Sequence, residues 1–236
     1  AIGGSKTSQH CKGQAIDIDD VYGCKTNAEM YHWVKENLNN ESIVIEAGAC
    51  EGLDTLFFSN IVNKIYSFEP IPALYNKALI NVEGRENVEL RNLALSDKNG
   101  KEKMYVSDRL GEYWGSSSLL KPKEHLKKHT EITFKEEIEI NTINLDDWYL
   151  KKNLSRIDML WLDLQGYEPI VLKSSPNILK NTKYLYTEVA LVENYENNIK
   201  YEDFKIFLND SGFEVIHDGI YWEDGGNVLF KNKNIE

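Results

Sequence analysis

Residues 43–69 constrain the fold of this chain more than any other stretch. The apolar run at 43–45 leads into a turn marked by glycines, and a second apolar run at 64–68 ends at the acidic residue Glu69. A β-branched strand, a glycine turn and a helix present backbone N–H groups to a ligand at the edge of an open α/β sheet. An acid about twenty residues after the turn has the spacing that lets a carboxylate hold ribose hydroxyls. The stretch therefore predicts a nucleotide-type cofactor site.

The charge of the turn indicates which cofactor binds. Residues 46–52 read Glu-Ala-Gly-Ala-Cys-Glu-Gly, with two glycines and two carboxylates. A dinucleotide site needs three glycines and little negative charge, because a pyrophosphate sits on the helix N-terminus. Glu46 and Glu51 would repel a pyrophosphate but suit the ammonium and sulfonium groups of S-adenosyl-L-methionine (SAM). We therefore expect SAM rather than NAD; the alternative is a tight turn whose acids are merely solvated.

The acidic composition limits the partners. The 236 residues include 27 Lys and Arg against 38 Asp and Glu, a formal net charge of -11. Binding duplex nucleic acid requires a basic face, so we expect no nucleic-acid partner. No apolar run approaches the roughly 20 residues of a membrane span, so we expect no membrane partner. Cys11, Cys24 and Cys50 are odd in number and scattered, which indicates a reducing, cytoplasmic location.

Regular α/β alternation follows the first forty residues. Thr26 and Glu29 have the spacing of a capping box and predict a helix that ends at residues 39–40. Apolar runs then predict strands at 43–47, 64–68, 88–93, 157–163, 184–189, 213–217 and 227–230. Helices are predicted at 53–60, 73–82, 169–173 and 201–210. This order predicts an α/β fold with a mostly parallel sheet and helices on both faces.

A long insertion, residues 96–156, separates the third and fourth main strands. It has strand-like segments at 101–106 and 132–143, and we expect it to lie over the carboxyl edge and shape an acceptor site. His125 and His129 within it are four residues apart, a helical metal spacing, but they lie in a lysine-rich stretch hostile to a divalent cation. We therefore expect a solvated helix face there and no metal.

Six motifs occur in a fixed order along the chain. They are Glu-Ala-Gly-Ala-Cys-Glu-Gly at 46–52, Phe-Glu-Pro at 68–70, Asn-Leu-Ala-Leu-Ser-Asp at 92–97, Gly-Ser-Ser-Ser at 115–118, Trp-Leu-Asp-Leu-Gln-Gly-Tyr-Glu at 161–168 and Asn-Val-Leu-Phe at 227–230. Together they resemble the FkbM family of SAM-dependent methyltransferases over about residues 41–236. Cys50 stands where that family usually has Asn, and Gln165 stands in place of the Glu of its Asp-Val-Glu-Gly motif. The second difference removes a carboxylate but leaves Asp163 and Gly166 in place.

The resemblance implies a Rossmann-like SAM methyltransferase fold, with a mostly parallel seven-stranded sheet whose last strand is antiparallel. It also implies that SAM lies across the carboxyl ends of the first four strands. The residues expected to bind the cofactor are Glu46, Ala47, Gly48, Ala49, Cys50, Glu51, Gly52, Glu69, Pro70, Asn92, Ala94, Leu95, Ser117 and Asp163.

These residues are expected to act in different ways. Gly48 and Gly52 allow close backbone approach to the methionine moiety, and the acids at 46 and 51 stabilise its ammonium or sulfonium. Glu69 is expected to hold the ribose hydroxyls, and residues 92–95 to wall the adenine.

Methyl transfer needs an acceptor atom in line with the methyl group and a base for its proton. Asp163, at the end of a buried strand, is the first candidate for base or acceptor orienter, with Glu188 and Glu168 as alternatives on the same edge. Each of them could instead be a strand-end acid that caps a helix. We therefore expect an O-methyltransferase that acts on a hydroxyl of a sugar, a glycan or a small metabolite, the acceptor class that the resemblance suggests.

The first forty residues carry a different pattern. Ser8, His10, Gly13, Ala15 and Asp17 resemble the zinc-binding signature of D-alanyl-D-alanine carboxypeptidase-type metallopeptidases, in which the His and the Asp are zinc ligands. The partners that complete such a site do not appear before about residue 40. We therefore expect a truncated peptidase-like segment at 1–40 with one helix, followed by a methyltransferase domain at 41–236. Zinc peptidase activity, and a methyltransferase fold without turnover, are the alternatives.

Overall fold

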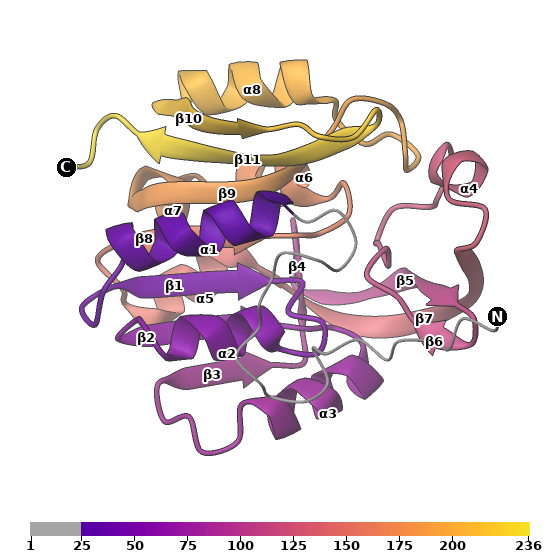
Figure 1. Cartoon of the computed structure of the whole chain (residues 1–236), viewed down its shortest axis with the longest axis horizontal. Coiled ribbons are helices and arrows are strands. Elements are labelled where there is room, and N and C mark those ends of the chain that lie inside the picture. Colours follow the sequence, from indigo (N-terminus) through magenta and orange to yellow (C-terminus); the bar gives the residue numbers. More distant parts are fainter. Residues whose placement is uncertain (1–24) are drawn as a thin grey trace, which may run out of the picture.

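The computed structural model describes residues 25–236 and has a seven-stranded sheet at its centre (Figure 1). The strands are β1 (Ile43–Ala47), β2 (Lys64–Phe68), β3 (Val88–Arg91), β8 (Ile157–Leu162), β9 (Thr182–Ala190), β10 (Phe213–Gly219) and β11 (Gly225–Asn232). Their order in the sheet is β10-β11-β9-β8-β1-β2-β3. Strand β11 pairs antiparallel with both β9 and β10, while the other pairings are parallel. The predicted α/β fold with an antiparallel last strand is therefore confirmed.

The central strands are apolar because both of their faces are covered. All six residues of β8 are buried. In β1, Val44 packs in one apolar cluster and Ile45 in another, because successive side chains of a strand point to opposite faces. Helices therefore have to cover both faces of the sheet.

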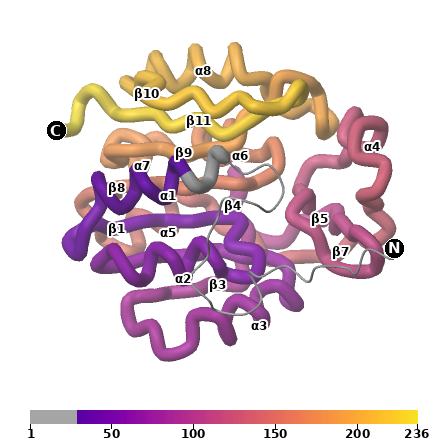
Figure 2. Tube along the Cα trace, in the orientation of Figure 1, coloured from indigo at the N-terminus to yellow at the C-terminus, as the bar shows by residue number. Residues whose placement is uncertain are grey.

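Helices α1 (Lys25–Asn37) and α2 (Leu53–Ser59) cover one face, in front of the strands in Figure 2. The other face is covered by α5 (Leu145–Lys152), α6 (Glu168–Lys173), α7 (Pro176–Lys180) and α8 (Tyr201–Asp210). Helix α1 places Met30 and Val34 in the same cluster as Phe58 of α2, and Leu38, just after α1, joins them. It thus shares the core of the sheet, and the division of the chain at residue 40 stays a prediction.

The insertion forms a second, four-stranded sheet beyond the carboxyl ends of β1 and β2 (Figure 1). Its strands are β4 (Ala94–Ser96), β5 (Gly100–Arg109), β6 (Glu112–Tyr113) and β7 (Thr133–Asn144), and it also carries the short helix α4 (His125–Lys128). Ile71 and Leu74, at the start of α3 (Pro72–Asn81), pack with Met104 and Ile140 of this sheet. The apolar contact fixes the insertion against the edge of the main sheet.

Some local structure differs from the sequence predictions. The third strand was expected at 88–93, but β3 ends at Arg91, and the amide of Asn92 donates to the carbonyls of Glu69 and Pro70. Helices α5 and α7 were not predicted. The side chain of Asn144 accepts the N–H of Asp147 at 3.1 Å and caps α5.

The prediction of a solvated histidine face is wrong for His125. Only 5% of this residue is exposed, and its ring packs against Phe134 and Tyr195. His129 is more open, with its Nε2 3.2 Å from Asp224 Oδ2. The pattern at 8–17 that resembles a zinc-binding signature lies outside the described residues. Within residues 25–236, no helix has the length and apolar character needed to cross a membrane.

Helix α8 offers a matched test of the packing. Leu208 is fully buried, whereas Ile206 on the same helix is 59% exposed. We expect Leu208→Ala to lower the free energy of unfolding by about 2–5 kcal/mol, because it leaves a cavity under the helix. Ile206→Ala should change it by less than about 0.5 kcal/mol. Urea denaturation followed by circular dichroism measures both, and equal losses would contradict the packing of α8 on the sheet.

Candidate active site

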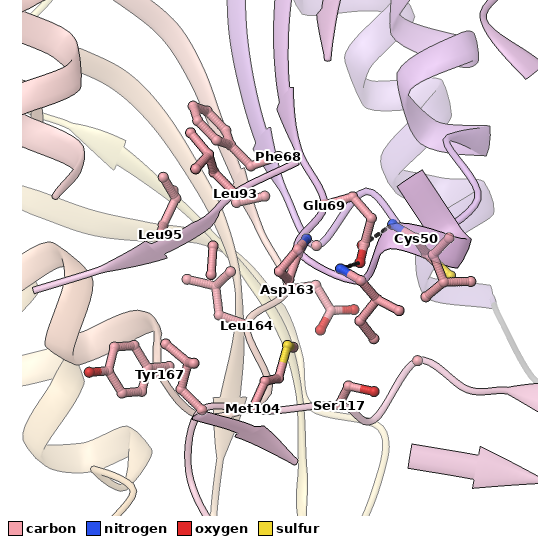
Figure 3. Close-up of a pocket in the computed structure, with 18 of the residues that line it drawn as sticks. Cys50, Phe68, Glu69, Leu93, Leu95, Met104, Ser117, Asp163, Leu164 and Tyr167 are labelled. Carbon is pink, nitrogen blue, oxygen red and sulfur yellow. Dashed lines mark hydrogen bonds between the residues drawn. The ribbon is translucent and has the colours of Figure 1, made fainter. Parts of the chain in front are cut away.

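A hollow lies at the carboxyl edge of the main sheet, where the insertion faces it (Figure 3). It encloses about 660 Å³ of space, part of it open to solvent. Its walls are Ala47, Gly48, Cys50, Phe68, Glu69, Pro70, Ile71, Leu74, Leu93, Ala94, Leu95, Met104, Trp114, Gly115, Ser117, Leu119, Asp163, Leu164 and Tyr167. We call this site the edge hollow. Nine of the residues predicted for cofactor binding line it: Ala47, Gly48, Cys50, Glu69, Pro70, Ala94, Leu95, Ser117 and Asp163.

The turn after β1 brings two strand ends together. Gly48 has a φ of 88°, and a Cβ there would lie 2.0 Å from the backbone oxygen of Asp163. The Asp163 N–H donates to the Ala47 carbonyl at 2.9 Å. Only glycine permits both the left-handed backbone and this close approach. Gly48 therefore places Asp163 directly beside the turn.

Glu69 is held in the edge hollow by the backbone (Figure 3). Its Oε2 accepts the N–H of Cys50 and its Oε1 accepts the N–H of Ile71, each at 2.8 Å. The residue is 4% exposed, and burial raises the pKa of its carboxyl to about 7. Two fixed backbone donors leave further lone pairs on both oxygens, which can accept hydrogens from a bound hydroxyl pair.

An apolar wall faces this carboxylate across the edge hollow. Leu93 and Leu164 follow strands β3 and β8 of the main sheet, whereas Leu95 lies on β4 and Met104 on β5 of the second sheet. Apolar side chains beside a single fixed polar group suit a flat aromatic ring attached to a sugar. Met104 and Trp114 were not predicted as site residues, because the sequence does not show which residues of the insertion face the edge.

Five predicted residues do not line the edge hollow: Glu46, Ala49, Glu51, Gly52 and Asn92. Their role in cofactor binding stays a prediction. Glu46 is 1% exposed, and its Oε2 accepts hydrogen bonds from Thr55 at 2.5 Å and Ser67 at 2.7 Å. Burial, with Asp54 nearby, raises the pKa of Glu46 to about 8, so the acid is largely neutral at pH 7.

Three of these five residues, Glu51, Asn92 and Gly52, also contact other parts of the protein. Glu51 forms an ion pair with Lys77 at 2.8 Å, and Asn92 donates to two carbonyls of the 69–70 turn. A Cβ at Gly52 would meet Ala78 of α3 at 2.9 Å, so this glycine permits close helix packing. The charge that sequence analysis assigned to residues 46 and 51 is therefore neutralised or paired within the protein.

Cys50 has an unusual backbone for its residue type. Its φ is 50°, a left-handed conformation that Asn adopts more readily than Cys. Burial and the nearby Glu69 raise the pKa of its thiol to about 12. The thiol is therefore protonated at neutral pH and is a poor nucleophile.

The three predicted catalytic acids form one cluster. One carboxylate oxygen from each of Asp163, Glu168 and Glu188 lies within 4.8 Å of the others. Desolvation raises the pKa of all three carboxyls, to about 8 for Glu168, and at Glu188 the charges of the other two raise it further. Glu168 is 1% exposed and its Oε1 accepts the Leu164 N–H at 2.6 Å, whereas Asp163 opens onto the edge hollow.

The side chain of Gln165 lies between two of these acids. Its Nε2 is 2.7 Å from Asp163 Oδ1 and 2.7 Å from Glu188 Oε2. From the sequence, residue 165 was recognised only as a lost carboxylate, and this contact was not predicted. The turn Asp-Leu-Gln-Gly gives no direct signal for it, because Glu188 comes from another strand.

Comparison with known proteins points to one family. The methyltransferase FkbM domain matches residues 46–215. The 2-O-methyltransferase NoeI of Sinorhizobium fredii (strain NBRC 101917 / NGR234) is 30% identical over 164 residues, which cover 67% of this chain and 68% of the relative.

One solved methyltransferase structure resembles the chain in its fold. A magnesium protoporphyrin IX methyltransferase from Synechocystis PCC 6803 with bound SAM has a TM-score of 0.51 at 11% identity, covering 88% of this chain and 78% of that one. An rRNA methylase from Streptococcus thermophilus has a TM-score of 0.49 at 16% identity, covering 86% and 94%. At such identities the likeness of the first structure concerns the Rossmann-like α/β fold alone.

Gly48 and Gly84 form a matched pair for testing the strand contact. Both have a left-handed φ, but a Cβ at Gly84 would meet nothing within 4 Å. We expect Gly84→Ala to cost about 1–2 kcal/mol of unfolding free energy from backbone strain alone. Gly48→Ala should cost roughly 3–5 kcal/mol, because the strand ends must also separate. Chemical denaturation measures both variants, and a similar cost at the two positions would contradict the close approach to Asp163.

Proposed function

Since the chain belongs to the FkbM family of methyltransferases and is a SAM-dependent O-methyltransferase, we propose that it methylates a hydroxyl of a sugar, a glycan or a small metabolite. The name of its relative NoeI, a 2-O-methyltransferase, supports a hydroxyl acceptor. One observation carries the proposal: a backbone-anchored carboxylate, Glu69, and an open carboxylate, Asp163, line the same edge hollow. The first suits a ribose and the second suits an acceptor proton.

The residues of the edge hollow fit the cofactor. Glu69 would accept the ribose hydroxyls, while Leu93, Leu95 and Met104 would contact the adenine faces. The turn at residues 47–50 would lie along the methionine moiety. Bound SAM supplies an electrophilic methyl group on a sulfonium. The role in cofactor binding stays a prediction for six further residues, which would contact the cofactor or support the turn that does: Glu46, Ala49, Glu51, Gly52, Asn92 and Ser117.

Asp163 is the preferred base. An acceptor oxygen must lose its proton as it gains the methyl carbon, so the base has to be ionised and reachable. Asp163 is open to the edge hollow, whereas Glu168 is enclosed and already accepts a backbone N–H. Glu188 is half-buried beside Asp163 and is the alternative. Desolvation raises the pKa of Asp163 above its ordinary value, which brings it closer to neutral pH, where a general base works best. The pKa of Glu188 is raised well above its ordinary value, which favours its protonated form and makes it the less suitable base.

The two alternatives predict different behaviour. A fold without turnover would bind SAM but release no methylated product. Zinc peptidase activity would need His10 and Asp17, which lie outside the described residues. A cytoplasmic location and the lack of a nucleic-acid partner stay predictions.

Cofactor binding should depend on pH through Glu69. Its carboxyl has a pKa of about 7, and only the ionised form accepts both ribose hydroxyls. Because a proton competes with the ligand, the affinity for S-adenosylhomocysteine should be near its maximum at pH 8 and fall as the pH drops through 7, becoming roughly tenfold weaker at pH 6. Isothermal titration calorimetry measures this. In Glu69→Gln the affinity should be low at both values, and an unchanged wild-type affinity across this range would contradict the role.

Methyl transfer should depend on Asp163. With methyl-labelled SAM and a panel of sugars, glycans and small alcohols, we expect label to appear as a methyl ether. Asp163→Asn should lower kcat by about 10²–10⁴-fold, because the base is lost, while S-adenosylhomocysteine binds within about threefold of wild type. The control Asp203→Asn alters an exposed acid on α8 and should have no effect. Binding of NAD instead of SAM, or label on nitrogen rather than oxygen, would contradict the proposed function.

A further inference from the structure

The amide of Gln165 bridges two acids that come from different strands. Asp163 follows β8 and Glu188 lies on β9, and the same nitrogen of Gln165 is 2.7 Å from an oxygen of each. A side-chain amide carries two hydrogens on this nitrogen and can donate one to each carboxylate at once. A glutamate at this position has the same shape, but in its ionised form it has no hydrogen to donate.

The oxygen of the same amide is fixed by a buried tyrosine. The Tyr195 hydroxyl lies 2.9 Å from Gln165 Oε1 and 2.8 Å from the Ser116 carbonyl, so its hydrogen can be shared between the two acceptors. Tyr195 is 3% exposed, and burial with the nearby charge of Glu188 raises the pKa of its phenol well above the ordinary value. The Tyr195 hydroxyl therefore stays protonated and can donate to Gln165 Oε1. This hydrogen bond fixes the amide oxygen towards Tyr195, so the amide nitrogen faces the two acids.

The backbone of residue 165 is held as well. The hydroxyl of Ser118 donates to the Gln165 carbonyl at 2.8 Å. Residue 165 has a φ of 53°, which is uncommon for glutamine, and Gly166 follows with a φ of 90°. This turn directs the side chain back towards Glu188 instead of along the next helix. A strained backbone at this point is consistent with a functional constraint on residue 165.

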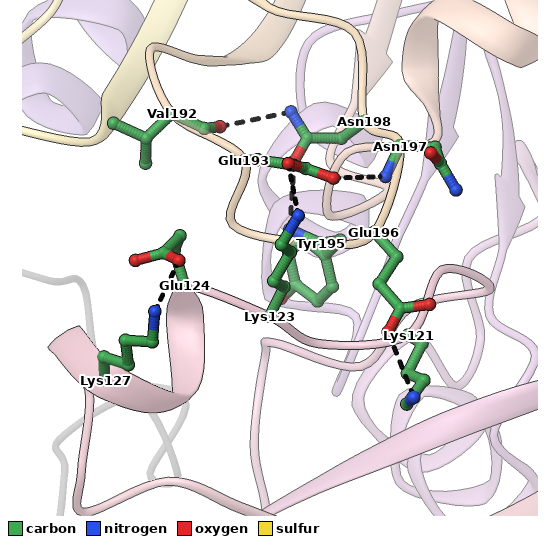
Figure 4. A network of polar contacts seen from close by, with 10 residues as sticks. All are labelled: Lys121, Lys123, Glu124, Lys127, Val192, Glu193, Tyr195, Glu196, Asn197 and Asn198. Carbon is green, nitrogen blue, oxygen red and sulfur yellow. Dashed lines mark hydrogen bonds and ion pairs between the residues drawn. The ribbon is translucent and has the colours of Figure 1, made fainter.

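Tyr195 in turn lies in a loop that is tied to the insertion (Figure 4). Two ion pairs join the segments, Lys121 with Glu196 at 3.0 Å and Lys123 with Glu193 at 2.5 Å. Within the loop, Asn198 accepts the Tyr195 N–H at 2.9 Å. Each exposed pair contributes little stability alone, but together they define where the tyrosine sits.

A hydrogen-bond donor such as the Gln165 amide stabilises the charged form of the clustered acids. Three carboxylates gathered within 4.8 Å tend to take up protons, because like charges and burial both disfavour ionisation. A hydrogen bond to the ionised form has the opposite effect, and the bond from Gln165 lowers the pKa of Asp163. The amide therefore favours the charged form of the group that accepts the proton.

We propose that Gln165 is a positioning residue for methyl transfer, which holds Asp163 beside Glu188, oriented for the acceptor hydroxyl, and favours the ionised form of Asp163. This inference rests on the proposed function. In the step it serves, the acceptor oxygen bonds to the methyl carbon as the bond from sulfur to that carbon breaks. The acceptor proton passes to one oxygen of the Asp163–Glu188 pair, and the sulfonium charge is lost as the thioether forms. Gln165 itself exchanges no atom.

The first test needs no acceptor. Carbon-13 NMR of labelled Asp and Glu carboxyls, recorded against pH with EDTA present, follows the Asp163–Glu188 pair, with Asp163→Asn and Glu188→Gln used for assignment. In Gln165→Glu we expect the apparent carboxyl pKa values of the pair to rise by about one unit or more, because two donors are replaced by a further acid. Unchanged titration of the pair in this variant would overturn the proposal.

The second test separates positioning from folding. At pH 8, Gln165→Glu should bind S-adenosylhomocysteine within about threefold of wild type, because Gln165 does not line the edge hollow. Its kcat should fall by about tenfold or more, and the acidic limb of its pH profile should move to higher pH. A merely structural role would lower kcat without moving that limb.

Two further variants test the left-handed backbone of residue 165 and the hydrogen bond from Tyr195 to its amide. Gln165→Gly relieves the left-handed backbone but removes the amide, so it should lose turnover even if it becomes more stable. Tyr195→Phe keeps the ring but frees the amide, and its pH profile should lie between those of wild type and Gln165→Glu. Full turnover in Gln165→Gly would overturn the proposal.

Different results would contradict the proposed function and the role of Gln165. If wild-type protein binds SAM but methylates no hydroxyl, the proposed function fails while the NMR titration still tests the amide bridge. If wild-type turnover is normal but the titration and the pH profile of Gln165→Glu match wild type, only the role of Gln165 fails. Several-fold stimulation of the wild type by Mg²⁺ would also overturn the bridge, because a cation would then take the place of the amide between the acids.

Discussion

The close contact between Gly48 and the backbone of Asp163 sets the geometry of the whole site. A left-handed glycine lets the end of β1 come within van der Waals distance of the end of β8, and the Asp163 N–H then pairs with the Ala47 carbonyl. The next residue but one, Cys50, directs its N–H at Glu69. Thus one backbone contact positions both the carboxylate that suits a ribose and the carboxylate that suits an acceptor. Larger side chains at residue 48 would separate the two.

The acids near the sheet edge are the second theme of the structure, and each accepts hydrogen bonds from a different kind of donor. Glu46 is satisfied by two hydroxyls, Glu69 by two backbone N–H groups, and the pair at 163 and 188 by one amide. Desolvation raises the pKa of each of these carboxyls. The donors that surround each acid therefore decide which ones are charged at neutral pH. The insertion contributes to this control, because it supplies Ser116 and Ser118 to the contacts of Tyr195 and Gln165.

Strand positions followed from the sequence because buried parallel strands are continuous apolar runs. The runs at 43–47 and 64–68 match β1 and β2 in both bounds. Helices α5 and α7 were missed because they are short and their start signals, an Asn cap and a proline, lie close to other elements. Strand β3 ends at Arg91 and not at residue 93, because the Asn92 side chain donates hydrogen bonds to the carbonyls of Glu69 and Pro70. The sequence does not show these hydrogen bonds.

The cofactor was identified correctly, but the two carboxylates from which it was inferred, Glu46 and Glu51, do not face the edge hollow. Alternation along β1 turns the side chain of Glu46 towards Thr55 of α2, away from the edge hollow. Contacts between distant segments were also invisible: Met104, Tyr195 and Gln165 meet the site only after the insertion and the loop at 191–200 have folded onto the sheet edge. Sequence patterns report which strand ends share an edge, but not which side chains turn inwards.

A crystal structure of the complex with S-adenosylhomocysteine tests the central claim most directly. We predict that both ribose hydroxyls lie within hydrogen-bond distance of Glu69, that the adenine lies among Leu93, Leu95 and Met104, and that the sulfur faces the bridge of Asp163, Gln165 and Glu188. A ribose bound away from Glu69, or a sulfur that faces away from this bridge, would contradict the account.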